Sequence, residues 1–556
     1  MKFFKKISAV FKAYDYTDKV VTALALAVFL LMIAKMMIFP YGFFNFGVSN
    51  LYTEGIVSKN GIQNLNPLFV EYNETDRDIS RLLFSGLMKY DPEKGAITED
   101  MASLTINELK TEYTFVMKNN LKWSDGEDVT ADDVYFTFHD VVLNPNFQNE
   151  ILKTNFSNVS VEKVDAKTIK FKLQKPNIFF ATSLTLGILP KHILKDVDPA
   201  LLLQNAFNKS PVGTGHYMIS DSIESFPDGR MQVTLTKNPY YYVDKSNIEN
   251  IRFISYPTMD QLVAQMNSVN GVVKITGEYI KKFQGNPRFE LIPYELPQYT
   301  AVFMNMDKPL IGKNKNVRLA LQKAVDKEKL IGEFVDKIPV DTPLMELNQK
   351  DWVYQASIQQ AEGALKDAGF KYPSGGKVRI TDKGEELKLN MIVRLYDDGT
   401  YQYEETKKVV SFLKSAWESV GFKIDVQFLA QDAFKSKISS RDYDLVLAGQ
   451  SLGYNLDTYS YWHSTQGNSN GQNLSNYKSF SVDTLIEDIR SVFDAEKRAV
   501  TLKKLAEQIK TDVPAVFLYR PVYYYASDKK ISGINMGGLV FPSDRFGRIG
   551  LWKFLR

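Results

Sequence analysis

The sequence predicts an α/β protein of two or three domains, held at a membrane by one N-terminal helix. Twenty residues from Val20 to Phe39 are apolar apart from Thr22 and Lys35. About five hundred residues of mixed polarity follow, which is too many for a single hydrophobic core. In that body short β-like runs alternate with amphipathic helices, and this alternation is typical of an α/β fold.

The apolar segment at 20–39 has the length of a transmembrane helix. At about 1.5 Å per residue it spans roughly 30 Å, the thickness of the hydrocarbon layer. Lysines outnumber acidic residues in the stretch before it, so the positive-inside rule places 1–19 in the cytoplasm and the body outside. We expect an uncleaved, single-pass anchor in the cytoplasmic membrane of a bacterium, because the following MMIFPYGFFNFG is too bulky for a signal-peptide cleavage site.

Composition excludes several classes of protein. The chain has no cysteine, which rules out disulfides, thiolate metal sites and a lipid anchor on an N-terminal Cys. Its net charge is +3, with 68 basic and 65 acidic residues and no basic stripe, so we expect no nucleic-acid partner. No metal-ligand spacing and no nucleophile elbow is present, and we therefore predict no enzyme activity, no metal and no cofactor.

The first part of the body predicts a helix followed by strands. Leucines at helical spacing predict a helix over 76–88. The segment TEYTFVMKNNLKW predicts a hairpin with a strand at 113–117 and a bend at Asn119-Asn120. Thr130 to Asp133 has the form of a capping box at a helix start, and a β-rich region is expected at 159–173.

The second part predicts an α/β lobe with some parallel strands. Asp326 is placed to cap a helix, and a polar stretch at 464–479 predicts a long surface loop. Interleaving of the remaining helices with strands indicates parallel pairing. The predicted helices are 317–324, 358–368, 410–420, 482–493 and 495–511, and the predicted strands are 232–236, 251–256, 387–394, 423–429 and 443–447.

A series of blocks, in order along the chain, resembles a known family. The blocks are LNPLFVEYNETDRDISRLLFSGLMKYD, YTFVMKNNLKWSDGEDVTADDVYFTF, SPVGTGHYMI with TLTKNPYYY, FMNMDKPLIGKNKNVRLALQKAVDKEKLI, DYDLVLAGQ and VDTLIEDIRSVFDAEKR. Together they resemble the extracellular solute-binding proteins of family 5, the dipeptide- and oligopeptide-binding group that feeds ABC importers. Their order along the chain makes a chance match difficult to sustain.

The resemblance implies a periplasmic-binding-protein-like two-lobed fold with an additional domain, in which the lobes close on the ligand by a hinge. It implies a discontinuous lobe I at 51–87, 210–297 and 487–545. The additional domain II would be 88–209, and lobe III would be 298–486. Such closure replaces the ligand's water with fixed donors and acceptors, and no chemistry on the ligand is required.

The resemblance also implies ligand contacts from both lobes. In lobe I the loop after the Asn-Pro pair carries over to Glu71, Tyr72 and Asn73, whose backbone can pair with an extended peptide. In lobe III the family uses the segment that is GYNLDTYSYW here. Peptide-binding relatives carry a carboxylate in it that holds the ligand's free α-amino group. If Asp457 aligns with the acidic residue three positions later, that position is Tyr454.

This departure affects the expected ligand. A neutral phenol at Tyr454 cannot pair with an ammonium as a carboxylate does, unless Asp457 turns inward instead. Peptide is the first expectation. A sugar or another capped solute is the alternative, because Tyr454, Tyr461 and Trp462 could stack on it.

The sequence therefore predicts a membrane-anchored, monomeric substrate-binding protein that captures peptides or peptide-like solutes outside the cell and delivers them to an ABC transporter permease. The alternative is a membrane-tethered sensor or scaffold built on the same binding body. The ligand contacts predicted for either function are Glu71, Tyr72, Asn73, Tyr454, Asp457, Tyr461 and Trp462.

Overall fold

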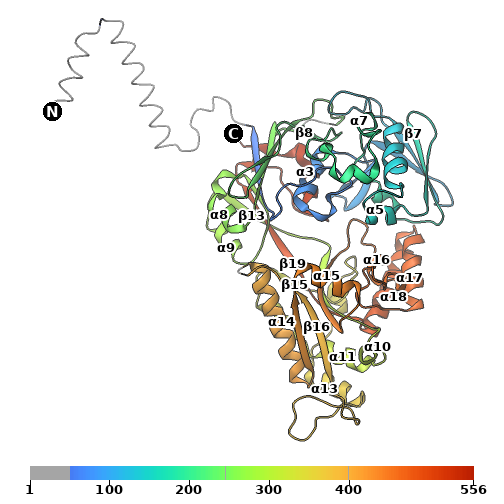
Figure 1. Cartoon of the computed structure of the whole chain (residues 1–556), viewed down its shortest axis with the longest axis vertical. Coiled ribbons are helices and arrows are strands. Elements are labelled where there is room, and N and C mark those ends of the chain that lie inside the picture. Colours follow the sequence, from blue (N-terminus) through green and yellow to red (C-terminus); the bar gives the residue numbers. More distant parts are fainter. Residues whose placement is uncertain (1–14, 16–49, 244–245, 399, 556) are drawn as a thin grey trace. The chain divides into compact units, whose positions relative to one another are not determined.

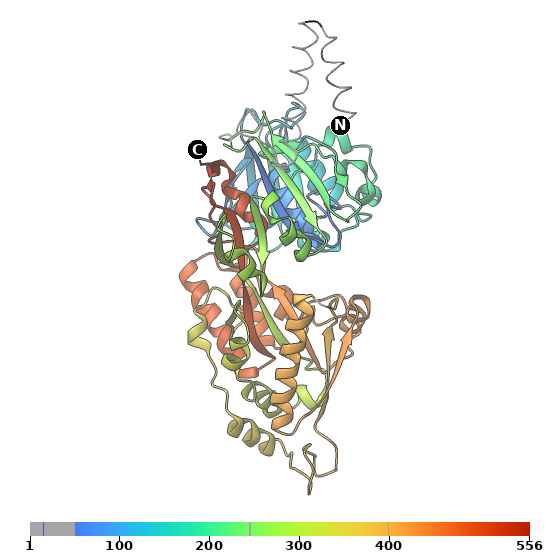
Figure 2. The same ribbon diagram turned by 90° about the vertical axis from the view of Figure 1, so that its left-hand side faces the viewer.

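The structure, a computed structural model, describes residues 15, 50–243, 246–398 and 400–555, without the side chain of Tyr72. Tyr52–Arg556 forms one compact unit (Figures 1 and 2). The predicted transmembrane helix at 20–39 lies outside the described residues, as does the predicted cytoplasmic segment at 1–19 apart from Asp15. Within the described ranges, no helix is long and apolar enough to cross a membrane.

A 13-stranded sheet continues through both lobes of this unit, in the order β17-β16-β18-β14-β19-β12-β1-β11-β10-β8, with β9, β13 and β15 paired beside this path. The strand β19 (Ala515–Asp528) belongs to both lobes. Its first half pairs with β14 (Gln298–Met304), and its second half pairs with β13 (Phe289–Glu295) and β12 (Gly271–Ile275). Figures 1 and 2 show β19 passing from one lobe into the other. The chain thus crosses between the lobes at the β13–β14 junction and within β19.

Lobe I holds the part of this sheet that runs from the second half of β19 through β12 to β8. Its helix α3 (Glu74–Leu83) begins where the Asn73 side chain accepts a hydrogen bond from Thr75 N–H. The helix ends at Leu83, before the predicted 88: the backbone is extended at Phe84, and β2 begins at Met88. The other elements are β1 (Leu51–Val57), η1 (Val70–Tyr72), β2 (Met88–Asp91), β3 (Ala96–Glu99), β8 (Tyr217–Ile219), β9 (Glu224–Ser225), β10 (Met231–Lys237), β11 (Asn250–Tyr256), α8 (Met259–Ala264), η5 (Met266–Ser268), α9 (Tyr279–Gln284), β20 (Ile531–Ser532), η8 (Pro542–Leu551) and β21 (Lys553–Phe554).

Domain II is built on a four-stranded sheet, β4-β5-β7-β6. The predicted strand at 113–117 is confirmed, but the predicted hairpin is wrong, because β5 pairs with β4 and β7 rather than with the residues after Asn120. The capping box from Thr130 to Asp133 is confirmed. The elements are β4 (Ala102–Ile106), β5 (Glu112–Met117), α4 (Ala131–Tyr135), the π-helix η2 (Phe136–Val142), α5 (Glu150–Asn155), β6 (Val159–Lys163), β7 (Thr168–Leu173), α6 (Phe180–Ser183), α7 (Lys191–Leu194), η3 (Pro199–Gln204) and η4 (Ala206–Lys209).

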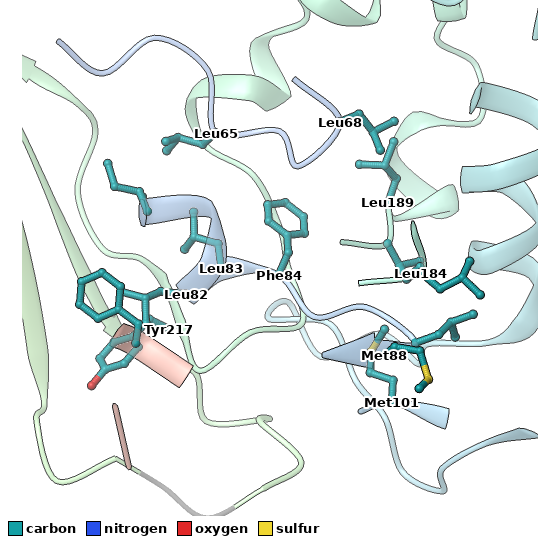
Figure 3. Close-up of a cluster of buried hydrophobic side chains, with 14 of the residues drawn as sticks. Leu65, Leu68, Leu82, Leu83, Phe84, Met88, Met101, Leu184, Leu189 and Tyr217 are labelled. Atoms are coloured by element: carbon teal, nitrogen blue, oxygen red, sulfur yellow. The ribbon is translucent and has the colours of Figure 1, made fainter. Parts of the chain in front are cut away.

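Domain II shares its core with lobe I. Leu82, Leu83 and Phe84 belong to the same buried cluster as Leu184 and Leu189 (Figure 3). Domain II and lobe I therefore bury apolar side chains against each other.

Lobe III carries helices on both faces of its sheet. β16 pairs in parallel with both β17 and β18, which confirms the predicted parallel pairing. The Asp326 cap on α12 is also confirmed. The elements are α10 (Pro309–Gly312), α11 (Lys315–Lys323), α12 (Lys327–Gly332), β15 (Lys337–Pro339), η6 (Gln349–Trp352), α13 (Ile358–Asp367), β16 (Lys388–Arg394), α14 (Tyr401–Ser419), β17 (Lys423–Leu429), α15 (Gln431–Ser439), β18 (Leu445–Ser451), α16 (Tyr459–Trp462), η7 (Ser464–Gln466), α17 (Phe480–Ser491) and α18 (Ala495–Asp512).

The return from lobe III to lobe I comes later than the predicted boundary at 487. Ile489 of α17 and Leu505 of α18 pack in the same buried cluster as Phe303 of β14. Both helices therefore belong to lobe III, and the chain leaves this lobe only within β19. The physical reason is that the apolar faces of α17 and α18 cover the lobe III sheet.

Candidate functional site

A cavity of about 340 Å³ lies where lobe III meets the strands that cross between the lobes. Its walls come from β14, β15, β18, β19, the first two turns of α14 and the loop after β12. A volume in this range suits a small solute or a short peptide. The lining residues are Thr276, Gln298, Tyr299, Thr300, Lys337, Tyr401, Gln402, Glu405, Gly449, Gln450, Ser451, Tyr519, Pro521 and Tyr523.

One wall of the cavity is an open strand edge. Leu452 N–H donates to Pro297 O at 2.9 Å, so the backbone N–H and C=O groups of Leu452 and of every second residue before it point toward β14. The N–H and C=O groups of successive residues point to opposite edges of a strand, so Gly449 and Ser451 direct theirs away from β14, to the other edge of β18. On that edge β16 pairs with β18 only as far as Leu447. Gly449 and Ser451 are exposed, and their N–H groups have no strand partner among the described strands.

A second wall is a buried ion network. Lys337 Nζ lies 3.2 Å from Asp336 Oδ1 and 3.3 Å from Glu405 Oε2. The Tyr401 hydroxyl lies 2.9 Å from both Asp336 oxygens. Gly277 N–H, from lobe I, donates to Asp336 Oδ2 at 2.9 Å. This network ties the two lobes together beside the cavity.

Gly277 is required at that contact. Its φ is +57°, and a Cβ would lie 2.2 Å from the Tyr401 ring. Any larger residue would be strained in the backbone and would displace Tyr401. The glycine therefore lets the loop after β12 approach the first turn of α14.

Glu405 is the carboxylate of the network that reaches the cavity. The Tyr519 hydroxyl donates to its Oε1 at 2.9 Å. The Glu405 side chain is 17% exposed, whereas Lys337 is 2% and Asp336 is 0% exposed. Burial raises the pKa of Glu405, and the nearby Lys337 ammonium only partly offsets this.

The ligand contacts predicted in lobe I form hydrogen bonds with other residues of the protein. The Glu71 carboxylate accepts from Asn149 Nδ2 at 2.7 Å, and burial raises its pKa. Asn73 caps α3 and donates through Nδ2 to Gly61 O at 3.0 Å. The backbone of Tyr72 lies in η1, and its side chain is outside the described part of the chain. None of these three residues lines the described cavity.

Tyr454 joins the two lobes instead of facing the cavity. Its hydroxyl donates to Asp544 Oδ1 at 2.7 Å. Its ring stacks on Tyr90, with centroids 4.7 Å apart, and meets Phe541 edge-on. These partners all belong to lobe I, so the Tyr454 side chain is occupied by contacts with other residues of the protein.

The other three predicted contacts lie in or beside α16. Asp457 forms an ion pair with Arg490 at 3.3 Å, and burial raises its pKa despite this partner. The Tyr461 hydroxyl donates to Ser451 O, which places it beside the open edge of β18. Trp462 is fully buried and packs against Phe303 and Phe517. Its ring therefore belongs to the core and is not available for stacking on a solute.

Several residues in and beside the cavity were not predicted from the sequence. Asp336, Lys337 and Glu405 come from two segments about 70 residues apart and meet only in the folded lobe. Gly449 and Ser451 directly follow the predicted strand at 443–447. A polar ending to an apolar strand was the one signal that could have pointed to them.

The groups that line the cavity are hydrogen-bond donors and acceptors. In the ranges that the structure describes, no cluster of His, Asp and Glu could hold a metal ion. The cavity presents backbone N–H groups, amides, phenols and one partly exposed carboxylate. This set can hold a polar solute by hydrogen bonds.

The chain resembles known solute-binding proteins. The family model described as "Bacterial extracellular solute-binding proteins, family 5 Middle" matches residues 96–473. The chain is 26% identical to the oligopeptide-binding protein AppA of Bacillus subtilis, over 83% of this chain and 85% of that protein. It is 21% identical to the probable D,D-dipeptide-binding periplasmic protein DdpA of Escherichia coli, over 85% and 89%.

Two solved structures show the same fold. NikZ from Campylobacter jejuni, in complex with Ni(L-His), has a TM-score of 0.74 and 23% identity, covering 91% of this chain and 99% of that one. AppA from Bacillus subtilis, in complex with a nonapeptide, has a TM-score of 0.73 and 22% identity, with the same coverage. These likenesses show a periplasmic-binding-protein-like, two-lobed α/β fold.

Proposed function

Because the chain belongs to family 5 of the bacterial extracellular solute-binding proteins, we propose that it captures a short peptide or peptide-like solute in the cavity at the β18 edge. The relatives named as oligopeptide- and dipeptide-binding proteins support peptide as the ligand class. The protein releases this solute unaltered to the permease of an ABC transporter. It acts as a monomer and not as an enzyme.

The open edge of β18 is the observation that carries this proposal. An extended peptide can add to such an edge as a further strand. Hydrogen bonds to the peptide main chain then supply affinity that does not depend on the peptide's side chains. Gly449 and Ser451 offer their N–H groups at that edge, inside a cavity of about 340 Å³. The Tyr461 hydroxyl donates a hydrogen bond to Ser451 O, and Tyr461 remains a candidate ligand contact at the end of the same edge.

The body is anchored to the outer face of the cytoplasmic membrane by the segment at 20–39. Its apolar length and the lysines before it support this proposal. Anchoring confines the body near the permease and raises its effective concentration there. The full chain should stay in the membrane fraction after an alkaline carbonate wash, and a chain lacking 1–39 should be released.

Substitution of Gly449 tests the open edge directly. Gly449→Pro removes the N–H that faces the cavity, while the pairing of β18 with β14 uses alternate residues and stays intact. We expect it to weaken binding of a tripeptide about tenfold in a calorimetric titration, the effect of about one hydrogen bond.

Gly449→Ala is the matched control. It keeps the N–H, and its Cβ would lie 3.6 Å from Tyr299 O, an ordinary contact. We expect Gly449→Ala to bind like the wild type. Equal affinity of the proline and alanine variants would remove the β18 edge from the site.

A further inference from the structure

Glu405 is the charged side chain of the cavity that a ligand can reach. Two ionisable residues other than tyrosine line the cavity, Lys337 and Glu405. Lys337 is 2% exposed and is enclosed by protein, whereas the Glu405 side chain is 17% exposed. A charged group of the ligand would therefore meet a carboxylate before it met an ammonium.

The Glu405 carboxylate has acceptor capacity left. One oxygen accepts from the Tyr519 hydroxyl at 2.9 Å, and the other lies 3.3 Å from Lys337 Nζ. A carboxylate has about four lone-pair sites, so these two partners do not saturate it. A donor entering from the cavity can form a further hydrogen bond.

The charge of this wall favours a cation. Asp336 and Glu405 carry two negative charges in their ionised forms, against the single positive charge of Lys337. Burial raises the pKa of Glu405, and the charge of Asp336 adds to this effect. A cationic group in the cavity would offset the excess negative charge, and an anionic group would increase it.

The aromatic rings around the network are compatible with a cation. Lys337 Nζ lies 5.5 Å from the centre of the Tyr401 ring and 5.4 Å from that of Tyr519. Both phenols also line the cavity, as does Tyr523. Electron-rich ring faces attract ammonium groups, so this wall suits an amine better than a carboxylate.

We infer that the ligand carries a protonated amine and that Glu405 binds it, an inference that rests on the proposed solute-binding function. Glu405 lies on α14, far along the chain from Tyr454 and Asp457, which are engaged by Asp544 and Arg490. The structure thus assigns recognition of the amine to a helix of lobe III rather than to the loop after β18.

The test compares free and blocked amines on the full chain in detergent. The probes are a synthetic library of di-, tri- and tetrapeptides without lysine or arginine, in two forms, with a free α-amino group and N-acetylated. Bound peptides are identified by native mass spectrometry. The variants are Glu405→Gln and the control Glu404→Gln, which removes the same charge from a neighbouring, exposed position outside the cavity lining.

We expect the wild type and Glu404→Gln to retain free-amine peptides at least about tenfold better than acetylated ones, and Glu405→Gln to lose this preference. The inference is overturned if Glu405→Gln keeps the preference, or if the wild type binds both forms equally. The second of these results needs no variant to fold. If the wild type retains no peptide of either form, the proposed peptide-binding function fails, and this inference fails with it.

Discussion

The hydroxyl of Tyr454 donates a hydrogen bond to the carboxylate of Asp544, 2.7 Å away, and so joins the loop after β18 to the C-terminal segment of lobe I. Asp544 also accepts from the N–H groups of Val540 and Phe541 at 3.1 and 2.8 Å. Burial of Asp544 raises its pKa. The lobes are thus held together by a contact that contains no ligand.

Tyr454→Phe should loosen this contact between the lobes. The variant removes one hydrogen bond to a carboxylate, which contributes about 1.5–3 kcal/mol, while the stack on Tyr90 can persist. We expect the radius of gyration of the ligand-free protein, measured by small-angle X-ray scattering, to increase. Tyr459→Phe is the control, because the Tyr459 hydroxyl contacts Thr465 within lobe III. Identical scattering profiles for the two variants would contradict the role of Tyr454.

Trp462→Phe separates a core role from a ligand-binding role. Because Trp462 is fully buried against Phe303 and Phe517, we expect the variant to lose about 1–3 kcal/mol of stability in thermal denaturation. We expect its affinity for a bound peptide to stay within about twofold of the wild type, a difference of less than 1 kcal/mol. A large loss of affinity with an unchanged melting temperature would return Trp462 to the ligand site.

His216 should make the protein less stable in acid. Burial, reinforced by Arg81 and Lys89, lowers the pKa of His216 from 6.5 to about 3. The unfolded chain takes up a proton below about pH 6.5, but the folded chain does not, so this contribution to stability is lost as pH falls from 6.5 toward 3. Between pH 7.5 and 5, the wild type should lose about 1–2 kcal/mol more than His216→Gln in urea unfolding. Equal losses would show that His216 titrates normally.

Two adjacent carboxylates in domain II should differ sharply in their effect on stability. Asp133 accepts from Thr130 N–H at 2.9 Å and from Lys191 N–H at 3.0 Å, and it is buried. Asp133→Ala leaves both donors without their partner and should cost about 2–4 kcal/mol in chemical denaturation. Asp132 pairs with Lys163 and Lys191 near the surface, so Asp132→Ala should cost less than about 1 kcal/mol. Equal costs would argue against a structural role for Asp133.

Local signals in the sequence predicted local structure well. The capping box at Thr130 and the Asp326 cap depend on residues three positions apart, and both are present in the structure. The interleaved helices and strands of lobe III also predicted its parallel pairing. In each case the residues that decide the structure are close together in the chain.

The predictions that failed depend on contacts between residues that are far apart in the chain. Asn119-Asn120 looked like a hairpin bend, but β5 finds its partners in β4 and β7. The boundary at 487 was misplaced because only packing shows that α17 and α18 cover lobe III. The wall formed by Asp336, Lys337 and Glu405 exists only after β15 and α14 have packed together.

The partner of Tyr454 also could not be predicted from the sequence. Tyr454 was predicted as a ligand contact, and in the structure its hydroxyl donates to Asp544 of the other lobe. Nothing in the local sequence indicates Asp544 as its partner, because 90 residues separate the two.

Native mass spectrometry of the full chain in detergent, after overnight incubation with a mixed library of short peptides, tests most directly whether the cavity at the β18 edge binds a solute without altering it. We predict one intact peptide per chain, retained by Gly449→Ala and largely lost from Gly449→Pro. Cleaved peptides, or the same retention by both Gly449 variants, would contradict this prediction.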